Sequence, residues 1–419
     1  MKYDTLIIGG GLAGLVCGIR LQEAGQRCAI LSAGQSALHF SSGSFDLLNR
    51  LPNGREVAEP LEALNALPYG HPYQMIGVER VKQFAEQVPE WFRQSVGVQL
   101  QGEVYRNHYR LSPIGIVKPA WMSFDEFTPI YNREETPMGK VLLINFEGFL
   151  DFYPKFIADA YIQGGGRCCV KLINLPAVEK LRINPTEMRA TNIARVFESE
   201  RQLAKLVAEI NRSITDEESV VLPATFGLTS MEPIEYLRAQ CRKPVHFVQP
   251  VPPSVSGIRT QQRLQDRFMA LGGDFFLGDR VENAIFEENR ITGLRTHNHG
   301  DILFHADHYV LATGSFFSNG IVARPNLVYE PVLGADVYYD ASRESWFDKS
   351  VFNPQPYMRY GILTDAALHP LREKQPISNC YAAGSILSGY NPLEEGCGSG
   401  VAILSAFDVS DKNLSSKQV

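Results

Sequence analysis

The stretch that decides the fold is Thr5-Leu-Ile-Ile-Gly-Gly-Gly-Leu-Ala-Gly14, near the start of a chain of 419 residues. Its apolar beginning is followed by the pattern G-x-G-x-x-G at Gly9, Gly11 and Gly14, and then by apolar residues at helical spacing as far as Gly25. A second apolar run covers residues 28–31. The pattern predicts a strand, a glycine turn, a helix and a second strand.

Each glycine of the turn has its own physical reason. Gly9 lets the chain turn sharply, Gly11 lets the backbone approach a pyrophosphate, and Gly14 lets the helix lie close to the strand. Chance alone gives about a quarter of one such pattern in a chain with 35 glycines, so the strand–helix context carries the weight. That context predicts a Rossmann-like nucleotide-binding fold. The alternative is a tight strand-to-helix turn without a ligand.

The end of the second strand lacks an expected acid. An Asp or Glu there usually binds the adenosine ribose, but this chain has Ser32, and no acidic residue occurs between Glu23 and Asp46. Two explanations stay open. Either weaker hydroxyl contacts hold the ribose, or the cofactor has no adenosine, as in FMN.

Two later segments add to the pattern. Residues 308–314 form an apolar run that ends in Ala-Thr-Gly, and they follow a predicted β-meander over 278–293. Residues 379–385 form a short strand that ends in Ala-Ala-Gly-Ser, and Glu395-Gly-Cys-Gly-Ser-Gly400 opens an apolar helix over 401–407. The N-terminus of that helix presents uncrowded N–H groups that suit a reduced flavin ring, with a plain glycine-rich cap as the alternative.

In this order the segments resemble flavoproteins of the glutathione-reductase-like superfamily. Blocks at 39–48, 252–259, 312–317 and 383–398 resemble, more closely, the B subunits of anaerobic glycerol-3-phosphate dehydrogenases, over nearly the whole chain. Where the superfamily commonly has Asp after the last Ala-Gly, this chain has Ser385, which makes a tight FAD clamp doubtful.

The resemblance implies a cofactor, partners and a reaction. The cofactor would be FMN, with FAD as the alternative. The partners would be a second flavoprotein, the A subunit, and a membrane-bound iron–sulfur protein, the C subunit. The complex would oxidise sn-glycerol 3-phosphate to dihydroxyacetone phosphate and pass electrons to menaquinone, for use with fumarate or nitrate.

The glycine and hydroxyl residues of these segments are the predicted cofactor site: Gly9, Gly11, Gly14, Ser32, Ser41, Ser42, Gly43, Thr313, Gly314, Gly384, Ser385, Gly396, Gly398, Ser399 and Gly400. Two residues are candidates for catalysis. His39 precedes a serine–glycine turn and suits removal of a hydroxyl proton, and Arg259 suits binding of a phosphate. Their simpler alternatives are a structural hydrogen-bonding histidine and a solvated or paired arginine.

The predicted fold class is α/β, with a discontinuous Rossmann-like flavin-binding domain, an inserted parallel α/β domain and a β-meander. The first part of the flavin domain covers 1–139, with an irregular cap from about 51, where prolines and aromatic residues suggest loops and irregular sheet. The inserted domain covers 140–250 and the second part of the flavin domain 251–408. Residues 409–419 are predicted to form a polar tail.

Composition excludes several classes of protein. The net charge of −6, without a basic block, argues against nucleic acid as a partner. Seven cysteines without paired spacing predict a reducing compartment and no metal site. The apolar stretch 6–19 is too short to span a membrane, and Asp4 beside Lys2 argues against a signal peptide. We therefore expect a peripheral protein at the cytoplasmic face of the inner membrane, attached through a partner protein.

Three alternatives to a substrate-oxidising role stay open. The chain relays electrons beside the A subunit, or it is a scaffold that keeps the nucleotide fold without redox chemistry, or it is a flavin-dependent oxidoreductase of another small hydroxy substrate.

Overall fold

The structure is a computed structural model that describes residues 2–133, 138–184 and 187–416. The chain divides into two compact units. The first spans Met1–Ala37, Asp46–Val96 and Arg263–Val419, and the second spans Leu38–Phe45 and Gly97–Gln262. Each unit is described by itself.

A five-stranded parallel sheet is the centre of the first unit. Its strand order is β12 (Asp274–Leu277), β2 (Cys28–Ser32), β1 (Lys2–Ile8), β15 (His305–Leu311) and β22 (Cys380–Ala382). Every residue of β2 and β22 is buried, as expected for strands of a sheet covered on both faces. The predicted strand, glycine turn, helix and strand are confirmed, with α1 at Leu12–Glu23.

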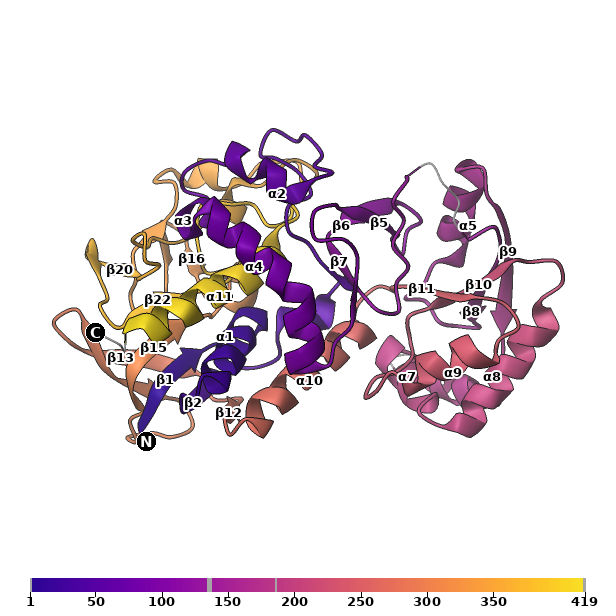
Figure 1. Cartoon of the computed structure of the whole chain (residues 1–419), viewed down its shortest axis with the longest axis horizontal. Helices are drawn as coiled ribbons and strands as arrows, with labels where there is room; N and C mark the ends of the chain where they lie inside the picture. Colours follow the sequence, from indigo (N-terminus) through magenta and orange to yellow (C-terminus); the bar gives the residue numbers. More distant parts are fainter. Residues whose placement is uncertain (1, 134–137, 185–186, 417–419) are drawn as a thin grey trace. The chain divides into compact units, whose positions relative to one another are not determined.

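Helices and short hairpins surround this sheet. Figure 1 shows α11 (Gly398–Ser416) beside α1, with α4 (Val78–Trp91) next to α11. The predicted β-meander over 278–293 is the antiparallel pair β13 (Val281–Glu287) and β14 (Arg290–Thr296). The remaining elements of this unit are α2 (Pro60–Ala63), α3 (Pro72–Ile76), β16 (Val322–Arg324), β17 (Leu327–Tyr329), β18 (Val337–Tyr338), β19 (Gly361–Ile362), β20 (Leu371–Arg372) and β21 (Gln375–Pro376).

The second unit contains a four-stranded parallel sheet. Its order is β11 (Val245–Val248), β10 (Ser219–Pro223), β8 (Lys140–Phe146) and β9 (Arg167–Ile173). Figure 1 shows α5 (Pro154–Gln163) on one face, and α7 (Ala190–Val196), α8 (Glu200–Ser213) and α9 (Glu232–Gln240) on the other. The other elements are α6 (Pro176–Glu179), β3 (Ser44–Phe45), β4 (Leu100–Gln101), β5 (His108–Leu111), β6 (Val117–Ala120) and β7 (Met122–Phe124), and α10 (Val255–Ala270) begins here and ends in the first unit.

The division differs from the predicted boundaries. Residues 140–250 are not a unit of their own, because residues 97–139, residues 38–45 and residues 251–262, the predicted start of the second part of the flavin domain, belong to the same unit. The pairing of β3 with β7 explains the second of these, since it ties residues 44–45 to residues 122–123. Residues 46–96 instead belong to the first unit.

The expectation of loops and irregular sheet from about residue 51 is wrong for most of residues 60–91. This stretch contains α2, α3 and α4, and α4 buries Val81, Phe84, Ala85 and Val88. That spacing of three, one and three residues is the apolar face of a helix, and the prolines nearby obscured it. Pro60 and Pro72 each begin a helix, where proline is tolerated.

The expectation of a polar tail from residue 409 also differs from the structure. Helix α11 continues to Ser416, and Asp408, Val409, Ser410 and Asn413 are buried on it; residues 417–419 of the predicted tail lie outside the described residues. The polar side chains have partners. Asp408 contacts Arg80 and Lys412, and Asn413 accepts a hydrogen bond from Gln26.

We predict that the side chain of Phe268 contributes strongly to the stability of the first unit. Its side chain is fully buried, and a Cβ added to Gly18 of α1 would lie 2.8 Å from Phe268 Cε2. Phe268→Ala is expected to reduce the free energy of unfolding by about 3–5 kcal/mol, because it opens a cavity between α10 and α1. Urea denaturation measures this. The neighbouring Met269 is 45% exposed, so Met269→Ala is the matched control, with a change of about 0.5 kcal/mol or less.

Candidate functional site

The turn after β1 is packed so closely that two of its glycines admit no side chain. Gly9 has φ +117°, and a Cβ there would lie 2.2 Å from the carbonyl oxygen of Ala312, at the end of β15. A Cβ on Gly14 would lie 2.0 Å from the carbonyl oxygen of Gly9. Gly9 and Gly14 thus have the packing roles that the sequence predicts, and their contact with a cofactor stays a prediction.

Gly11 differs from its neighbours because its side faces open space. It is the N-cap residue of α1, and the nearest atom to an added Cβ would be Ser36 Cβ, at 4.0 Å. Among the described residues, the backbone of Gly11 is thus not closely covered on this side, and it stands at a helix N-terminus, which attracts anions.

A second observation at the same edge of the sheet points to a ligand. Thr313 follows β15, and its Oγ1 is buried without a hydrogen-bond partner among the described residues. Buried hydroxyl groups are normally satisfied, so this atom has a donor and an acceptor to offer to a bound molecule. Together with Gly11 it fits the phosphate end of a flavin nucleotide.

The turns after β15 and β22 meet at the start of α1. Gly314 and Gly384 both have positive φ, at +85° and +81°. A Cβ on Gly314 would lie 3.5 Å from Ser385 Oγ, and one on Gly384 would lie 2.8 Å from Ala13 Cβ. The structure therefore brings together five predicted site residues at the carboxyl edge of the sheet, where α/β proteins bind ligands: Gly11, Thr313, Gly314, Gly384 and Ser385.

Ser32 is buried beneath the first glycine turn. Its Oγ donates a hydrogen bond to the carbonyl oxygen of Gly34, at 3.0 Å, and a Cβ on Gly10 would lie 2.7 Å from that Oγ. An acid reaches this end of the sheet from another strand, because the N–H of Asp279 donates to the carbonyl oxygen of Ser32. The Asp279 carboxylate accepts from the N–H of Asn298 and contacts His299 Nδ1 at 2.6 Å. It is thus already engaged.

The start of α11 is more crowded than the sequence predicts. The N–H of Gly400 donates to the carbonyl oxygen of Asp46, and a Cβ on Gly400 would lie 2.3 Å from the Tyr73 hydroxyl. Ser399 Oγ accepts from the N–H of Asp46 at 2.6 Å, and a Cβ on Gly396 would lie 2.5 Å from Asn49 Nδ2. Gly396 and Gly400 are therefore required by packing against residues 46–49. A Cβ on Gly398 would lie 3.1 Å from Pro392 Cβ.

The segment with His39 belongs to the second unit. The carbonyl oxygen of His39 accepts from the N–H of Ser254, and Ser41 Oγ accepts from the N–H of Gly43. Ser42 Oγ lies 3.3 Å from Ser44 Oγ. The half-buried imidazole of His39 has its pKa lowered by desolvation. It is therefore neutral at pH 7 and able to accept a proton.

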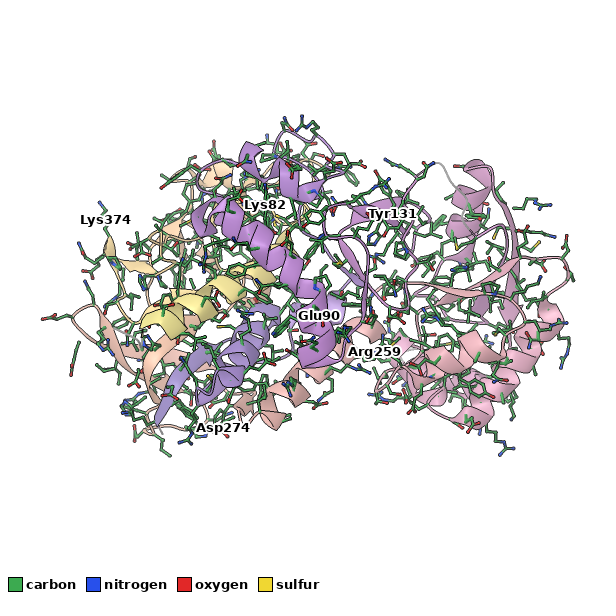
Figure 2. All side chains as sticks on the ribbon, in the orientation of Figure 1. Lys82, Glu90, Tyr131, Arg259, Asp274 and Lys374 are labelled. Atoms are coloured by element: carbon green, nitrogen blue, oxygen red, sulfur yellow. The ribbon has the colours of Figure 1, made fainter. Side chains whose placement is uncertain are left out.

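Arg259, labelled in Figure 2, is a paired arginine, which is the simpler alternative to a phosphate ligand. It is 4% exposed, and its guanidinium forms an ion pair with Glu126 and hydrogen bonds with the carbonyl oxygens of Phe226 and Gly227. The guanidinium is held by partners inside the second unit. Its contact with a substrate phosphate stays a prediction without support from this arrangement.

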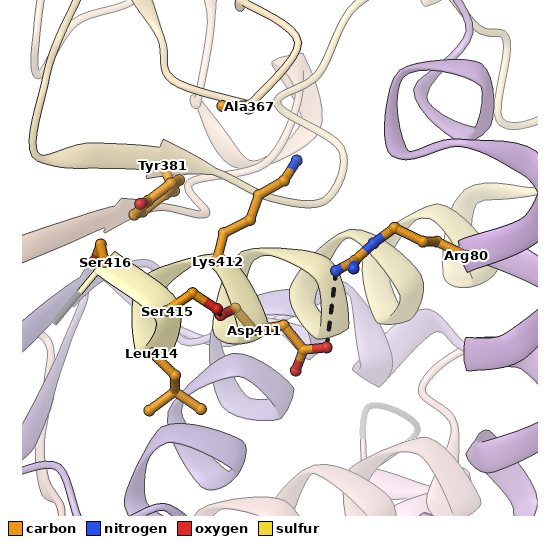
Figure 3. Close-up of a pocket in the computed structure, with 8 residues that line it drawn as sticks. All are labelled: Arg80, Ala367, Tyr381, Asp411, Lys412, Leu414, Ser415 and Ser416. Carbon is orange, nitrogen blue, oxygen red and sulfur yellow. Dashed lines mark hydrogen bonds and ion pairs between the residues drawn. The ribbon is translucent and has the colours of Figure 1, made fainter. Parts of the chain in front are cut away.

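An open pocket of about 700 Å³ lies elsewhere in the first unit, near the end of α11 (Figure 3). The residues that line it are Arg80, Ala367, Tyr381, Asp411, Lys412, Leu414, Ser415 and Ser416. None of them is a predicted site residue. Arg80 and Lys412 both contact the buried Asp408, and Arg80 also lies 3.8 Å from Asp411, so two carboxylates face these two cations. We do not assign a ligand to this pocket.

Sequence reasoning missed a buried cluster directly before α11. His71, Glu395 and Cys397 each offer a ligand atom, and these atoms lie within 4.8 Å of one another. Residue spacing could not show it, because His71 is more than 300 positions from the other two. Across residues 2–133, 138–184 and 187–416, no helix has the length and apolar character to cross a membrane.

Comparisons with known proteins identify the family. Residues 4–401 match the family model described as FAD binding domain. The chain is similar to the B subunit of the anaerobic glycerol-3-phosphate dehydrogenase of Yersinia enterocolitica, with 45% identity over all of both chains. The protein of the same name from Glaesserella parasuis is 37% identical, over 98% of this chain and 99% of that one. Among solved structures, 3-ketosteroid delta1-dehydrogenase from Sterolibacterium denitrificans matches with a TM-score of 0.46 and 11% identity, over 99% of this chain and 100% of that one.

We predict that Gly11→Ala and Gly14→Ala have opposite profiles. Gly11 has φ −83° and open space, so Gly11→Ala should change the free energy of unfolding by about 1 kcal/mol or less, while it weakens flavin binding at least about tenfold. Gly14→Ala should destabilise the protein by about 1–3 kcal/mol, because α1 must move away from Gly9. Thermal unfolding and flavin titration separate the two effects. Unchanged flavin affinity in Gly11→Ala contradicts the assignment.

Proposed function

We propose that this chain, which belongs to the FAD binding domain family and to the B subunits of anaerobic glycerol-3-phosphate dehydrogenases, is a flavoprotein that oxidises sn-glycerol 3-phosphate to dihydroxyacetone phosphate. One observation supports the flavin above all. The turns after β1, β15 and β22 meet at one edge of the sheet, with the open side of Gly11 and the buried Thr313 hydroxyl among them.

The reaction needs two things from the protein besides the cofactor. When bound, a flavin accepts a hydride from the carbon that carries the secondary hydroxyl group. The hydroxyl proton must pass to a base, and a cation must bind the substrate phosphate. His39 is our proposed base, since its lowered pKa leaves it neutral at pH 7. Arg259 is the proposed phosphate ligand only if it leaves Glu126.

The ion pair of Arg259 with Glu126 favours a second candidate function. If this chain lacks a cation for the substrate phosphate, the substrate is oxidised on another protein of the complex and this chain relays electrons through its own flavin. The relay keeps the cofactor and removes the need for a base. A scaffold without redox chemistry, or another small hydroxy substrate, remains a further alternative.

We propose that electrons leave through a second flavoprotein, the A subunit, and a membrane-bound iron–sulfur protein, the C subunit, to menaquinone, with fumarate or nitrate as the final acceptor. The complex would lie at the cytoplasmic face of the inner membrane. The relatives are themselves named as subunits, which supports an assembly of several chains.

We propose FMN as the cofactor, with FAD as the alternative that the description of the matched family favours. Ser32 stands where an acid usually binds the adenosine ribose, and the nearby Asp279 is engaged with His299 and Asn298. Acid release of the flavin followed by chromatography decides between the two. Recovery of FAD contradicts this proposal.

Purified chain without its partner proteins tests the function. We expect a yellow protein with an oxidised-flavin spectrum, which sn-glycerol 3-phosphate bleaches under anaerobic conditions. Bleaching only after the A subunit is added identifies the relay. A colourless protein that binds neither added FMN nor added FAD supports the scaffold and overturns the proposal.

We predict that His39→Asn slows anaerobic bleaching by about 10²–10⁴-fold and leaves the flavin bound, because the base is lost. In the unaltered protein the rate should rise with pH through the pKa of His39, which desolvation lowers, and level off above it, since only the neutral imidazole accepts a proton. Stopped-flow absorbance measures both effects. His297→Asn, at an exposed histidine that contacts Glu282, is the control and should not slow bleaching. An unchanged rate in His39→Asn excludes His39 as the base.

A further inference from the structure

The buried cluster before α11 contains an ion pair between Glu395 and Arg359. Glu395 is fully buried, and its Oε1 lies 3.0 Å from Arg359 Nη2 and accepts a hydrogen bond from the N–H of Asn391 at 3.0 Å. Its Oε2 lies 3.3 Å from Nε2 of His71, which is also fully buried. Arg359 is 31% exposed at its side chain, so one end of the pair is shielded from water and the other reaches toward it.

The position of its proton makes His71 a poor metal ligand. His71 is the N-cap of α3, and its Nδ1 accepts a hydrogen bond from the N–H of Tyr73 at 3.1 Å. A neutral imidazole that accepts at Nδ1 carries its proton on Nε2, whereas a ligating nitrogen must present a lone pair. Arg359 also occupies the carboxylate with a positive charge. The cluster of His71, Glu395 and Cys397 is thus better explained by charge than by a metal ion.

The charges of this cluster sum to zero. Desolvation lowers the pKa of His71, so its imidazole is neutral, and burial raises the pKa of the Cys397 thiol. The negative charge of Glu395 is balanced only by Arg359 within this cluster of four residues. Removal of either partner leaves a net charge in a region of low dielectric constant, where Coulomb interactions are strong.

This pair is close in the chain to the predicted flavin site. Glu395 lies three residues before α11, and the carbonyl oxygen of Cys397 accepts the hydrogen bond from the N–H of Val401 in the first turn of that helix. The same helix lies against the turn after β22, since a Cβ on Gly384 would lie 3.9 Å from Ala402 Cα. The N–H of Gly384 also donates to Ser405 Oγ. The first two turns of α11 thus connect the segment that carries Glu395 to the predicted site.

We propose that the Arg359–Glu395 pair sets the reduction potential of the flavin, with the N–H of Asn391 fixing the position of the Glu395 carboxylate. The inference rests on the proposed flavin site and adds a role for residues that do not touch the cofactor. A flavin gains negative charge when it is reduced, so a nearby positive charge favours reduction and a nearby negative charge opposes it. In the intact pair, the effects of Arg359 and Glu395 on the reduction potential oppose each other. A substitution of one residue leaves the effect of the other.

The experiment measures the flavin potential of the purified full-length chain by equilibration with redox dyes from about pH 7 to pH 9, because a buried carboxyl group that has lost its cation takes up a proton more readily than an exposed one and is most fully ionised at the upper end of this range. Glu395→Gln is expected to raise the potential, because Arg359 remains. Arg359→Gln is expected to lower it, because Glu395 remains. The double variant should return toward the original value, and Arg359→Lys, which keeps the charge, should stay close to it.

Opposite signs separate a charge effect from structural damage, which has no reason to reverse between the two partners. Thermal unfolding identifies any variant that does not fold. If Glu395→Gln is such a variant, Arg359→Gln and Arg359→Lys still decide, since Arg359 is partly exposed. Shifts of the same sign, or unchanged potentials in folded variants, overturn the inference and leave the flavin site intact. A colourless wild-type protein overturns the flavin site itself, and this inference with it.

Discussion

The contact between the turn after β1 and the start of α1 is the constraint on which the rest of the first unit depends. A Cβ on Gly14 would lie 2.0 Å from the carbonyl oxygen of Gly9, and a Cβ on Gly9 would lie 2.2 Å from that of Ala312. Three chain segments therefore approach at backbone distance, and only glycine permits it. The N-terminus of α1 is fixed at the carboxyl edge of the sheet as a result. The position of the predicted ligand site follows from this backbone packing.

The first glycine motif was predictable because its determinants are local. The glycine spacing and the apolar runs at residues 5–8, 28–31 and 308–314 all lie within short windows of sequence, and the structure has β1, β2 and β15 at these runs. The turns that carry Thr313, Gly314, Gly384 and Ser385 could be placed for the same reason, since the carboxyl ends of neighbouring parallel strands share one edge. Their contact with a flavin is a matter of chemistry that no backbone pattern decides.

The errors arose where a segment is stabilised by partners far away in the chain. Residues 409–416 look polar in the sequence, yet on α11 Ser410 accepts a hydrogen bond from Arg20 and Asn413 bonds with Gln26 and Thr5. Hydropathy counts such residues as exposed because it cannot see that each polar group has a partner. Arg259 shows another distant partner, since its charge suggested a ligand and the structure pairs it with Glu126, 133 positions earlier, while its contact with a substrate phosphate stays a prediction. A single sequence holds no local signal for either pairing.

The start of α11 shows how the fold handles charge near a site proposed to receive electrons. A helix N-terminus attracts negative charge, but here the Gly400 N–H is bonded to the Asp46 carbonyl and the nearby Glu395 is itself negative. The hydrogen bond to Asp46 thus satisfies one N–H group at the start of the helix, and the Glu395 carboxylate opposes the positive potential of this helix end. Arg359 restores neutrality from the solvent side. A buried Glu395 without a cation would destabilise the fold. The stability of the fold and the electrostatics of the site therefore both require the positive charge of Arg359. The proposed transfer of electrons to a partner protein would benefit from this balance, since a flavin beside an uncompensated positive charge would retain them.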